Sequence, residues 1–248
     1  MEILKDSLIL LKKEPKVFVP RLITTAVYTL FIFYSAKVTF DIFTGVGNFR
    51  DMLILGIFSP ILLGIDLVSY GMYPKIIMDY YDGKKINLTG ILLETLKSWK
   101  ILLVFGIIIS IFIFIFIGLM SVLYGIALAA GNFAILFLAT VFAILILLIF
   151  STASFFVMPV GILEKQGVVN TLRKSIGLSI MHKKDVLNVN IVFMILAIVT
   201  IIIATLSEFG GIFTYLAFAV FLIARLFQAV VYTYIGVVNP TVYLKLRG

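Results

Sequence analysis

One uncharged segment limits what this chain can fold into. From Ile101 to Leu163 there is no Asp, Glu, Lys, Arg or His. As a single helix this segment would reach roughly 95 Å at 1.5 Å per residue, about three times the ~30 Å hydrocarbon core of a bilayer. It must therefore cross a membrane and fold back once, and Ala130-Gly131-Asn132 is the turn signal near its middle. With 62% apolar and 13% charged residues, the chain has too little polar surface for a soluble domain.

Runs of about 20 apolar residues are long enough to span the membrane as helices. The chain offers six of them, at 17–36, 52–73, 101–128, 133–160, 186–206 and 211–238. Glu208 with Gly210-Gly211 is the turn signal between the last two. The prolines expected to close the even-numbered spans are Pro74, Pro159 and Pro240. We predict an all-α, polytopic membrane protein with six transmembrane helices, arranged as three hairpins in a single transmembrane domain, 1–248.

The distribution of basic residues predicts the orientation. Six spans place both termini on one side of the membrane, and that side would hold seventeen of the 20 Lys and Arg residues. The other side would hold only Lys37 and Arg50, and Arg225 lies inside a span. Because loops rich in Lys and Arg stay in the cytoplasm, we expect a multi-pass protein of the cell membrane with both termini cytoplasmic.

Three segments on the basic side predict short amphipathic helices, at 2–13, 90–100 and 168–180. The apolar face of the second consists of Ile91, Leu92, Thr95, Leu96 and Trp99, and that of the third consists of Val169, Leu172, Ile176 and Ile180. We expect these helices to lie in the headgroup layer, although they could instead pack on the protein's own surface. The residues expected to contact lipid are Trp99, Lys97, Lys100, Arg173, Lys174, Lys12 and Lys13.

The same segments predict a threefold internal repeat. If Ser7, Thr95 and Ser175 are equivalent, the proline that follows each lies 67, 64 and 65 residues later. Each unit would be one interfacial helix followed by a transmembrane hairpin, at approximately 1–85, 86–166 and 167–248. Three copies in the same orientation would form a parallel repeat, unlike the inverted halves of many transporters.

Two stretches carry a resemblance to known proteins, "SLILLKKEPKVFVP" (7–20) and "FVMPVGILEKQGVVNTLRKSIGLSIMHKKDVL" (156–187). They resemble poorly characterised prokaryotic families of six-helix membrane proteins, including the membrane domain attached to some glycerophosphoryl diester phosphodiesterases. The resemblance implies the architecture and no functional residues. Since the sequence ends at Gly248, we expect no soluble catalytic domain and no phosphodiesterase activity.

Asp66 is an acid within the second apolar run. A charge at mid-helix costs about 2.5–3.5 kcal/mol, and each Leu, Ile, Phe or Val returns about 0.3–0.6 kcal/mol, so the helix can still insert. We expect Asp66 to face protein or water and to pair with Arg225, which also needs a partner and lies one turn from Gln228. Arg21 is the alternative partner, and without a cation Asp66 would be protonated. The set is either an intramembrane polar site or a structural clamp.

Several functions are not expected from this sequence. It has no Cys, one His, no Ser-His-Asp set and no Gly-rich phosphate loop, so we expect no catalytic residues, metal site or cofactor. The net charge of +8 indicates anionic lipid rather than nucleic acid. We expect a non-enzymatic protein that organises membrane lipids or a partner protein at the cytoplasmic leaflet. The alternative is a small transporter or channel that uses Asp66 and Arg225.

Overall fold

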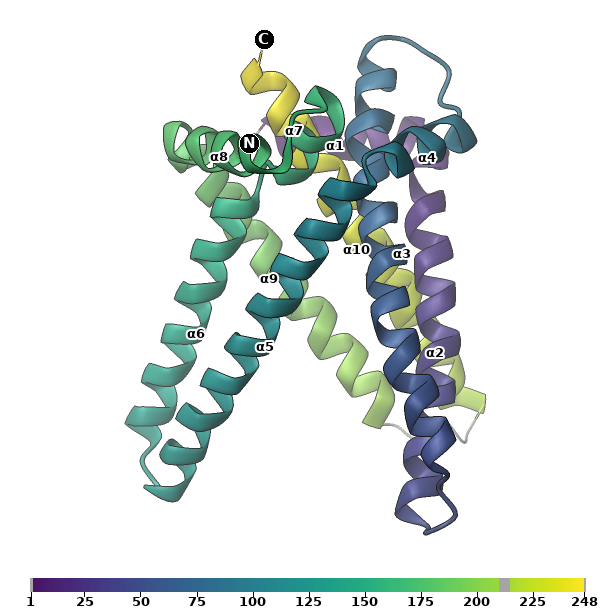
Figure 1. Cartoon of the computed structure of the whole chain (residues 1–248), viewed down its shortest axis with the longest axis vertical. Helices are drawn as coiled ribbons and strands as arrows, with labels where there is room; N and C mark the ends of the chain where they lie inside the picture. Colours follow the sequence, from purple (N-terminus) through teal and green to yellow (C-terminus); the bar gives the residue numbers. More distant parts are fainter. Residues whose placement is uncertain (1, 210–214, 248) are drawn as a thin grey trace. The chain divides into compact units, whose positions relative to one another are not determined.

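The computed structural model describes residues 2–209 and 215–247. Helices make up 91% of the structure, and the described residues form no strand. Figure 1 shows the elements in chain order. They are α1 (Glu2–Lys13), η1 (Pro15–Phe18), α2 (Val19–Phe43), α3 (Phe49–Tyr81), α4 (Leu88–Lys97), α5 (Trp99–Ala129), α6 (Phe133–Ser154), α7 (Val157–Glu164), α8 (Val168–Met181), α9 (Lys183–Phe209) and α10 (Tyr215–Arg247). The all-α prediction is confirmed.

The predicted number of spans is also confirmed. Six stretches of described residues are long and apolar enough to cross a membrane. They are Pro15–Phe43, Phe49–Tyr81, Trp99–Ala129, Phe133–Glu164, Lys183–Ile203 and Phe218–Arg247. Several of these helices are longer than the apolar runs from which they were predicted, because polar and aromatic residues at the ends of the runs are also helical.

The turn in the middle of the uncharged segment forms where it was predicted. α5 ends at Ala129, and Gly131 adopts φ +59°, a left-handed conformation that glycine adopts without strain. Asn132 then caps α6, since its side chain accepts a hydrogen bond from the backbone N–H of Ala134 at 2.9 Å. The turn predicted at Gly210-Gly211 lies outside the described residues, and α9 continues past Glu208 to Phe209.

The prediction that prolines close the even-numbered spans is wrong. Pro74 and Pro240 lie inside α3 and α10, and Pro159 lies in the first turn of α7, where a missing N–H costs no intrahelical bond. An interior proline costs a helix about 3 kcal/mol. In α3 the residues after Pro74 offset this cost, because Ile76 and Ile77 are fully buried.

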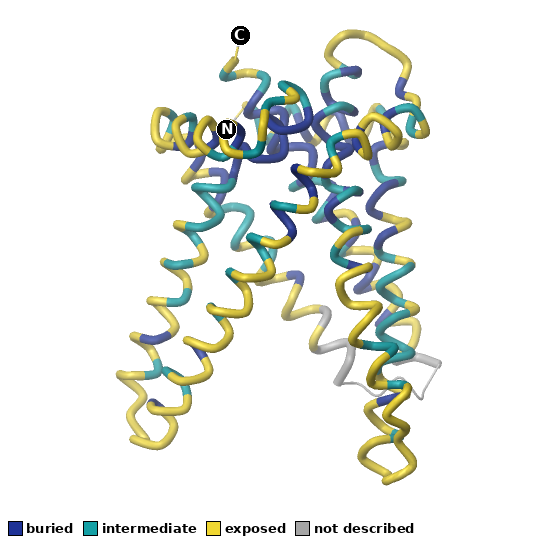
Figure 2. Tube along the Cα trace, in the orientation of Figure 1, coloured by how far each residue is buried: buried dark blue, intermediate teal, exposed yellow. Residues whose placement is uncertain are grey.

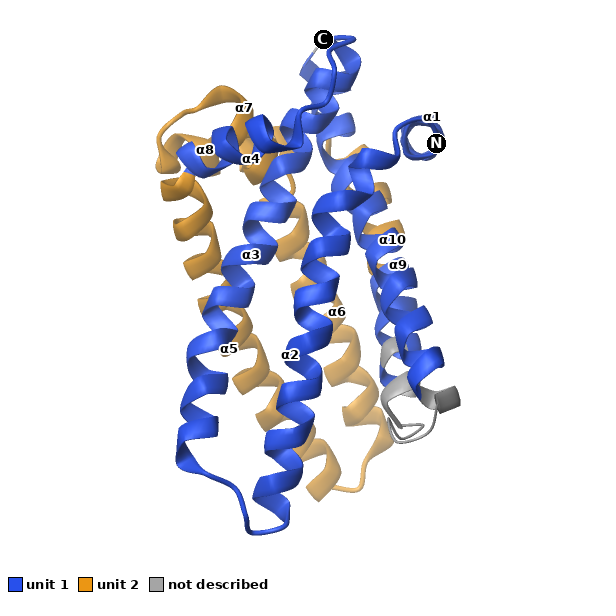
Figure 3. Cartoon of the chain, turned by 90° about the vertical axis from the view of Figure 1, so that its right-hand side faces the viewer, with its two compact units in different colours: residues 1–98, 195–248 blue, residues 99–194 orange. Residues whose placement is uncertain are grey.

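The chain divides into two compact units, shown in Figure 3. Unit 1 comprises residues 1–98 and 195–248, and unit 2 comprises residues 99–194. In unit 1 the three long helices α2, α3 and α10 pack against one another, α1 packs on α10, and α4 packs on α3. In unit 2 the hairpin of α5 and α6 carries α8, which packs on α6 and α7.

Burial within unit 1 is concentrated at the end where α1 and α4 lie (Figure 2). There the core cluster joins residues of α1, η1, α3, α4 and α10, with Tyr73 fully buried among them. The hydroxyl of Tyr73 donates to the backbone carbonyl of Val17 at 3.1 Å. Toward the other end of α3, residues 56–61 are exposed, as expected for helices solvated by lipid. We call the buried end the head of unit 1.

Unit 2 has a sparser interior. Phe112 of α5 stacks on Phe150 of α6 with 3.7 Å between ring centroids, and the Tyr124 and Thr140 hydroxyls are 3.0 Å apart. Across one end of the hairpin runs α8, crosswise to α5 and α6 (Figure 1). The hydroxyl of Ser175 on α8 donates to the backbone carbonyl of Ala153 at 3.1 Å, which fixes α8 to α6.

Gly236 of α10 gives a direct test of the head's packing. A Cβ atom there would lie 2.8 Å from Cδ2 of the buried Tyr73 ring. We expect Gly236→Ala to lower the free energy of unfolding by about 1–3 kcal/mol, because an overpacked core forces backbone shifts. Thermal unfolding in detergent measures the effect.

Gly64→Ala on α3 is the matched control, because a Cβ atom added there would meet nothing within 4 Å and alanine favours a helix. Equal stability of Gly236→Ala and the wild type would contradict the close contact between α3 and α10.

Candidate functional site

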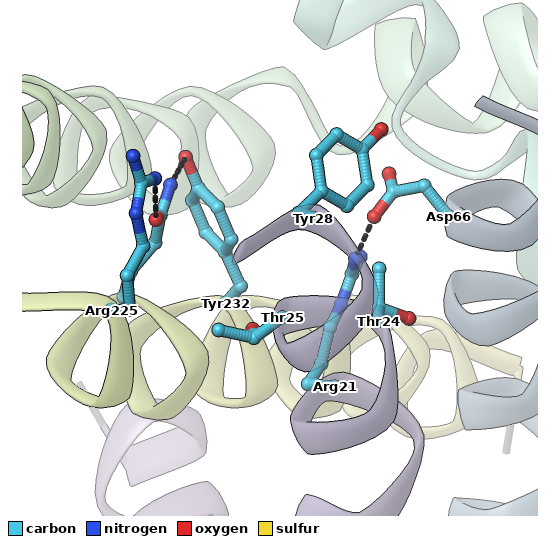
Figure 4. Close-up of a pocket in the computed structure, with 8 residues that line it drawn as sticks. Arg21, Thr24, Thr25, Tyr28, Asp66, Arg225 and Tyr232 are labelled. Carbon is cyan, nitrogen blue, oxygen red and sulfur yellow. Dashed lines mark hydrogen bonds and ion pairs between the residues drawn. The ribbon is translucent and has the colours of Figure 1, made fainter. Parts of the chain in front are cut away.

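A cavity of about 250 Å³ lies between α2, α3 and α10 in unit 1 (Figure 4). It includes all four residues predicted for the intramembrane polar site. The lining residues are Arg21, Thr24, Thr25, Tyr28, Asp66, Arg225, Gln228 and Tyr232. The chain therefore brings charges from its first, second and last spans to one place.

Asp66 pairs with Arg21, so the preference for Arg225 as its partner is wrong. The Arg21 Nη1 atom donates to the Asp66 Oδ1 atom. The reason is depth. Arg21 lies in the first turn of α2, and α2 packs along α3 so that this turn reaches the middle of α3. Arg225 was preferred because it also needs a partner, and the Gln228 side chain on its own helix accepts a hydrogen bond from it.

Arg225 is buried, with 8% of its surface exposed, and it contacts side chains of its own helix. Its Nη1 atom donates to the Gln228 Oε1 atom at 2.8 Å, and the Gln228 Nε2 atom donates to the Tyr232 hydroxyl at 3.3 Å. The guanidinium also lies over the Phe221 ring, 5.0 Å from its centroid. This chain of contacts along α10 orients the arginine beside the cavity.

The Arg21 guanidinium lies near aromatic rings on both α3 and α10. Its Cζ atom lies 5.6 Å from the centroid of Tyr70 on α3 and 5.9 Å from that of Tyr232 on α10. Arg21 is 7% exposed, whereas the side chain of Asp66 is 37% exposed. The carboxylate is thus the more accessible member of the pair.

Asp66 lies at the middle of α3, but α3 is longer than a membrane span needs to be. α3 has 33 residues, roughly 50 Å at 1.5 Å per residue, which exceeds a ~30 Å hydrocarbon core. The excess lies in the head, where Met72, Tyr73 and Ile77 are buried. Arg21 is close to the start of α2, whereas Asp66 is at the middle of α3, so the cavity begins beside the head and extends toward the middle of the spans.

Sequence reasoning missed Thr24, Thr25, Tyr28 and Tyr232 as members of this site. One signal could have found three of them. The segments "RLITTAVY" (21–28) and "RLFQAVVY" (225–232) share Arg, Leu, Val and Tyr at the same four positions. In both, offsets of 0, 3 and 7 place the Arg, the polar residue and the Tyr on one helix face. The two faces meet at the cavity.

The residues predicted for lipid contact are all exposed. Lys97 ends α4, but Trp99 and Lys100 belong to the first turn of α5, so the helix predicted over 90–100 is broken at Ser98. Lys12 and Lys13 end α1. On α8, Lys174 forms an ion pair with Glu164 at 2.6 Å, so it is engaged by the protein, while Arg173 is exposed beside it.

The described residues contain no group of three or more His, Asp or Glu side chains that could hold a metal ion. The fold and the site define a helical, multi-pass membrane protein with a polar cavity lined by arginines. No family model, curated protein or solved structure matches the chain. The resemblance to six-helix prokaryotic families therefore stays a prediction.

The ion pair between Arg21 and Asp66 can be measured by a double-mutant cycle. We expect Arg21→Gln and Asp66→Asn each to destabilise the protein, and the double variant to be more stable than the sum of their effects predicts. The coupling should be about 1–2 kcal/mol, moderated because Asp66 is partly exposed. Thermal unfolding of the four proteins in the same detergent gives the value. Additive effects would show that the pair does not couple.

Proposed function

We propose that this chain is a non-enzymatic membrane protein that organises anionic lipid at the cytoplasmic leaflet. In this proposal α1, α4 and α8 lie in the headgroup layer, and both termini are cytoplasmic. The seventeen basic residues expected on that side support the orientation. The exposed Lys12, Lys13, Lys97 and Arg173 would attract anionic headgroups.

The distribution of buried residues on α8 carries the proposal. α8 buries Thr171, Ser175 and Ser179, which repeat every four residues along one face. On another face it exposes Val169, Ile176 and Ile180, at 77%, 45% and 66%. A helix on a soluble protein buries its apolar side chains and exposes its polar ones. The reverse arrangement fits a helix whose outward face contacts acyl chains.

The other two crosswise helices support the proposal to different degrees. α4 buries Ile91 as well as Thr95, while Leu93 and Leu96 are 58% and 43% exposed. α1 is less extreme, because it buries Leu10 and Leu11 and exposes Leu8 and Ile9. All three helices have an apolar and a polar face, as interfacial placement requires, and α8 differs from the other two because every residue it buries is polar.

A threefold repeat is part of this proposal. Ser7, Thr95 and Ser175, the residues taken as equivalent, are each fully buried. The Thr95 hydroxyl is 3.5 Å from the Gly71 carbonyl of α3, and the Ser175 hydroxyl contacts α6. α1 in turn packs on α10 and is bound to it by the ion pair between Asp6 and Lys245. Each crosswise helix thus packs on an even-numbered span.

Cysteine labelling tests the interfacial placement cleanly, because the chain contains no cysteine. We expect Ile180→Cys to react several-fold more slowly than Arg173→Cys with a water-soluble maleimide in inside-out vesicles, since the thiol would lie among acyl chains. A bimane label at position 180 should also be quenched by brominated lipid. Thiol reactivity follows exposure to water.

Equal labelling rates at positions 173 and 180, together with no quenching, would contradict the placement. Protection of position 180 in lipid vesicles without quenching would point to a partner protein on the apolar face. Labelling only in right-side-out vesicles would reverse the proposed orientation.

A small transporter or channel is the second candidate, and the polar cavity is the observation that favours it. The pairing of Asp66 with Arg21 weighs against it, because the acid is already neutralised by an arginine. For liposomes containing the purified protein, we expect no flux of protons, K⁺ or Cl⁻ above that of empty liposomes. Flux that Asp66→Asn abolishes, in a protein that retains its fold, would establish transport instead.

A further inference from the structure

We propose that the cavity between α2, α3 and α10 binds a phosphate oxyanion, carried by a phospholipid headgroup or by free phosphate. The inference extends the proposed function. The lipid source of the phosphate rests on that function, whereas binding of free phosphate does not. Of the eight lining residues, seven carry an N–H or O–H donor, of which the Thr24 hydroxyl donates to the Pro20 carbonyl at 3.0 Å, and only Asp66 is an acceptor alone. A ligand rich in acceptor oxygens is the chemical complement of such a lining.

Arg21 supplies an independent observation. This residue is more than nine-tenths buried, and its Nε atom has no hydrogen-bond partner among the described residues. Its Nη1 atom is already bound to Asp66, so the Nε–H is the donor of this guanidinium that no described residue accepts from. Buried donors are rarely left without an acceptor. A phosphate has three or more oxygens with which to complete this set.

The two Arg-Leu segments explain how the cavity is built for one anion. α2 and α10 are the first and last of six spans, so they cross the membrane in opposite directions and pack together. Their matched faces therefore run antiparallel, which brings Tyr232 beside Arg21 and puts the two arginines on different helices around one cavity (Figure 4). Arginine forks match the geometry of phosphate oxygens.

The size and position of the cavity fit a headgroup. A water molecule occupies about 30 Å³ of liquid, so the cavity of about 250 Å³ has room for a phosphate with its neighbouring atoms or for about eight waters. The Arg21 end of the cavity lies beside the head, near the start of α2, which is the end of the spans where the proposed function places the headgroups. The carboxylate of Asp66 competes with the phosphate for Arg21, which lowers the affinity of the cavity for the phosphate.

The experiment uses the full-length protein, delipidated in detergent, with two probes. One probe is phosphatidylglycerol in mixed micelles with phosphatidylcholine, and the other is inorganic phosphate alone. Native mass spectrometry counts retained lipid, and the shift of the thermal unfolding midpoint gives the affinity of each probe. The variants are Arg225→Gln, Arg225→Lys and Asp66→Asn. The control is Arg50→Gln, which removes the same charge from an exposed site outside the cavity.

We expect Arg225→Gln to weaken binding about tenfold or more, because a charge-assisted hydrogen bond is lost. Arg225→Lys should fall between this variant and the wild type, and Arg50→Gln should bind as the wild type does. Asp66→Asn should bind more tightly, since it releases Arg21. A shift with phosphatidylglycerol but not with phosphate identifies lipid as the source, and a shift with phosphate alone identifies the free ion.

The proposal is overturned if neither probe responds to Arg225→Gln more than to Arg50→Gln, or if Asp66→Asn abolishes binding. Since labelling at position 180 is independent of the cavity, failure here leaves the proposed placement of α8 standing. Failure of the labelling experiment likewise leaves this binding test intact.

Discussion

The length of α3 and α10 relative to a bilayer is the constraint from which the rest of unit 1 follows. Each has 33 residues, and neither fits within ~30 Å of hydrocarbon. The excess turns at one end form the head, where apolar side chains are buried against one another. There Tyr73 packs against Gly236 and binds the carbonyl of Val17, and α1 and α4 pack around it. Farther along the helices lipid replaces water, so exposed Leu, Ile and Phe side chains cost nothing there.

The length of α3 also determines where the cavity lies. Because α3 extends past the start of α2, the first turn of α2 meets α3 at Asp66, and Arg21 supplies the cation. The charges can be retained near the head because each has a defined contact, with Arg21 on Asp66 and Arg225 on Gln228. An uncompensated charge in this environment would be expensive. Within unit 1 the cavity and the crosswise helices α1 and α4 thus put cationic groups near one end of the spans, which supports both functional proposals.

The polar residues buried in the crosswise helices show how hydroxyl groups can replace apolar packing in a membrane protein. Thr95 and Ser175 are fully buried against spans whose backbone carbonyls accept their hydrogen bonds. Small hydroxyl side chains allow close approach between helices, and those of Thr95 and Ser175 are hydrogen-bonded there. The large apolar side chains are thereby left on the outside of these helices. In a soluble protein they would promote aggregation, whereas at a membrane surface they insert among the lipids and hold the helix there.

The sequence by itself determined the fold class, the six spans and the turn at Gly131, because hydrocarbon thickness and the absence of charge from Ile101 to Leu163 allow no other arrangement. It also placed Asp66, Arg225, Gln228 and Arg21 as members of one polar site. Only the tertiary structure decided that Asp66 pairs with Arg21, since that contact depends on how far α3 slides past α2. It likewise decided that α3 and α10 continue through Pro74 and Pro240. Local propensity favours a stop at proline, and the burial of Ile76 and Val242 in the head outweighs it.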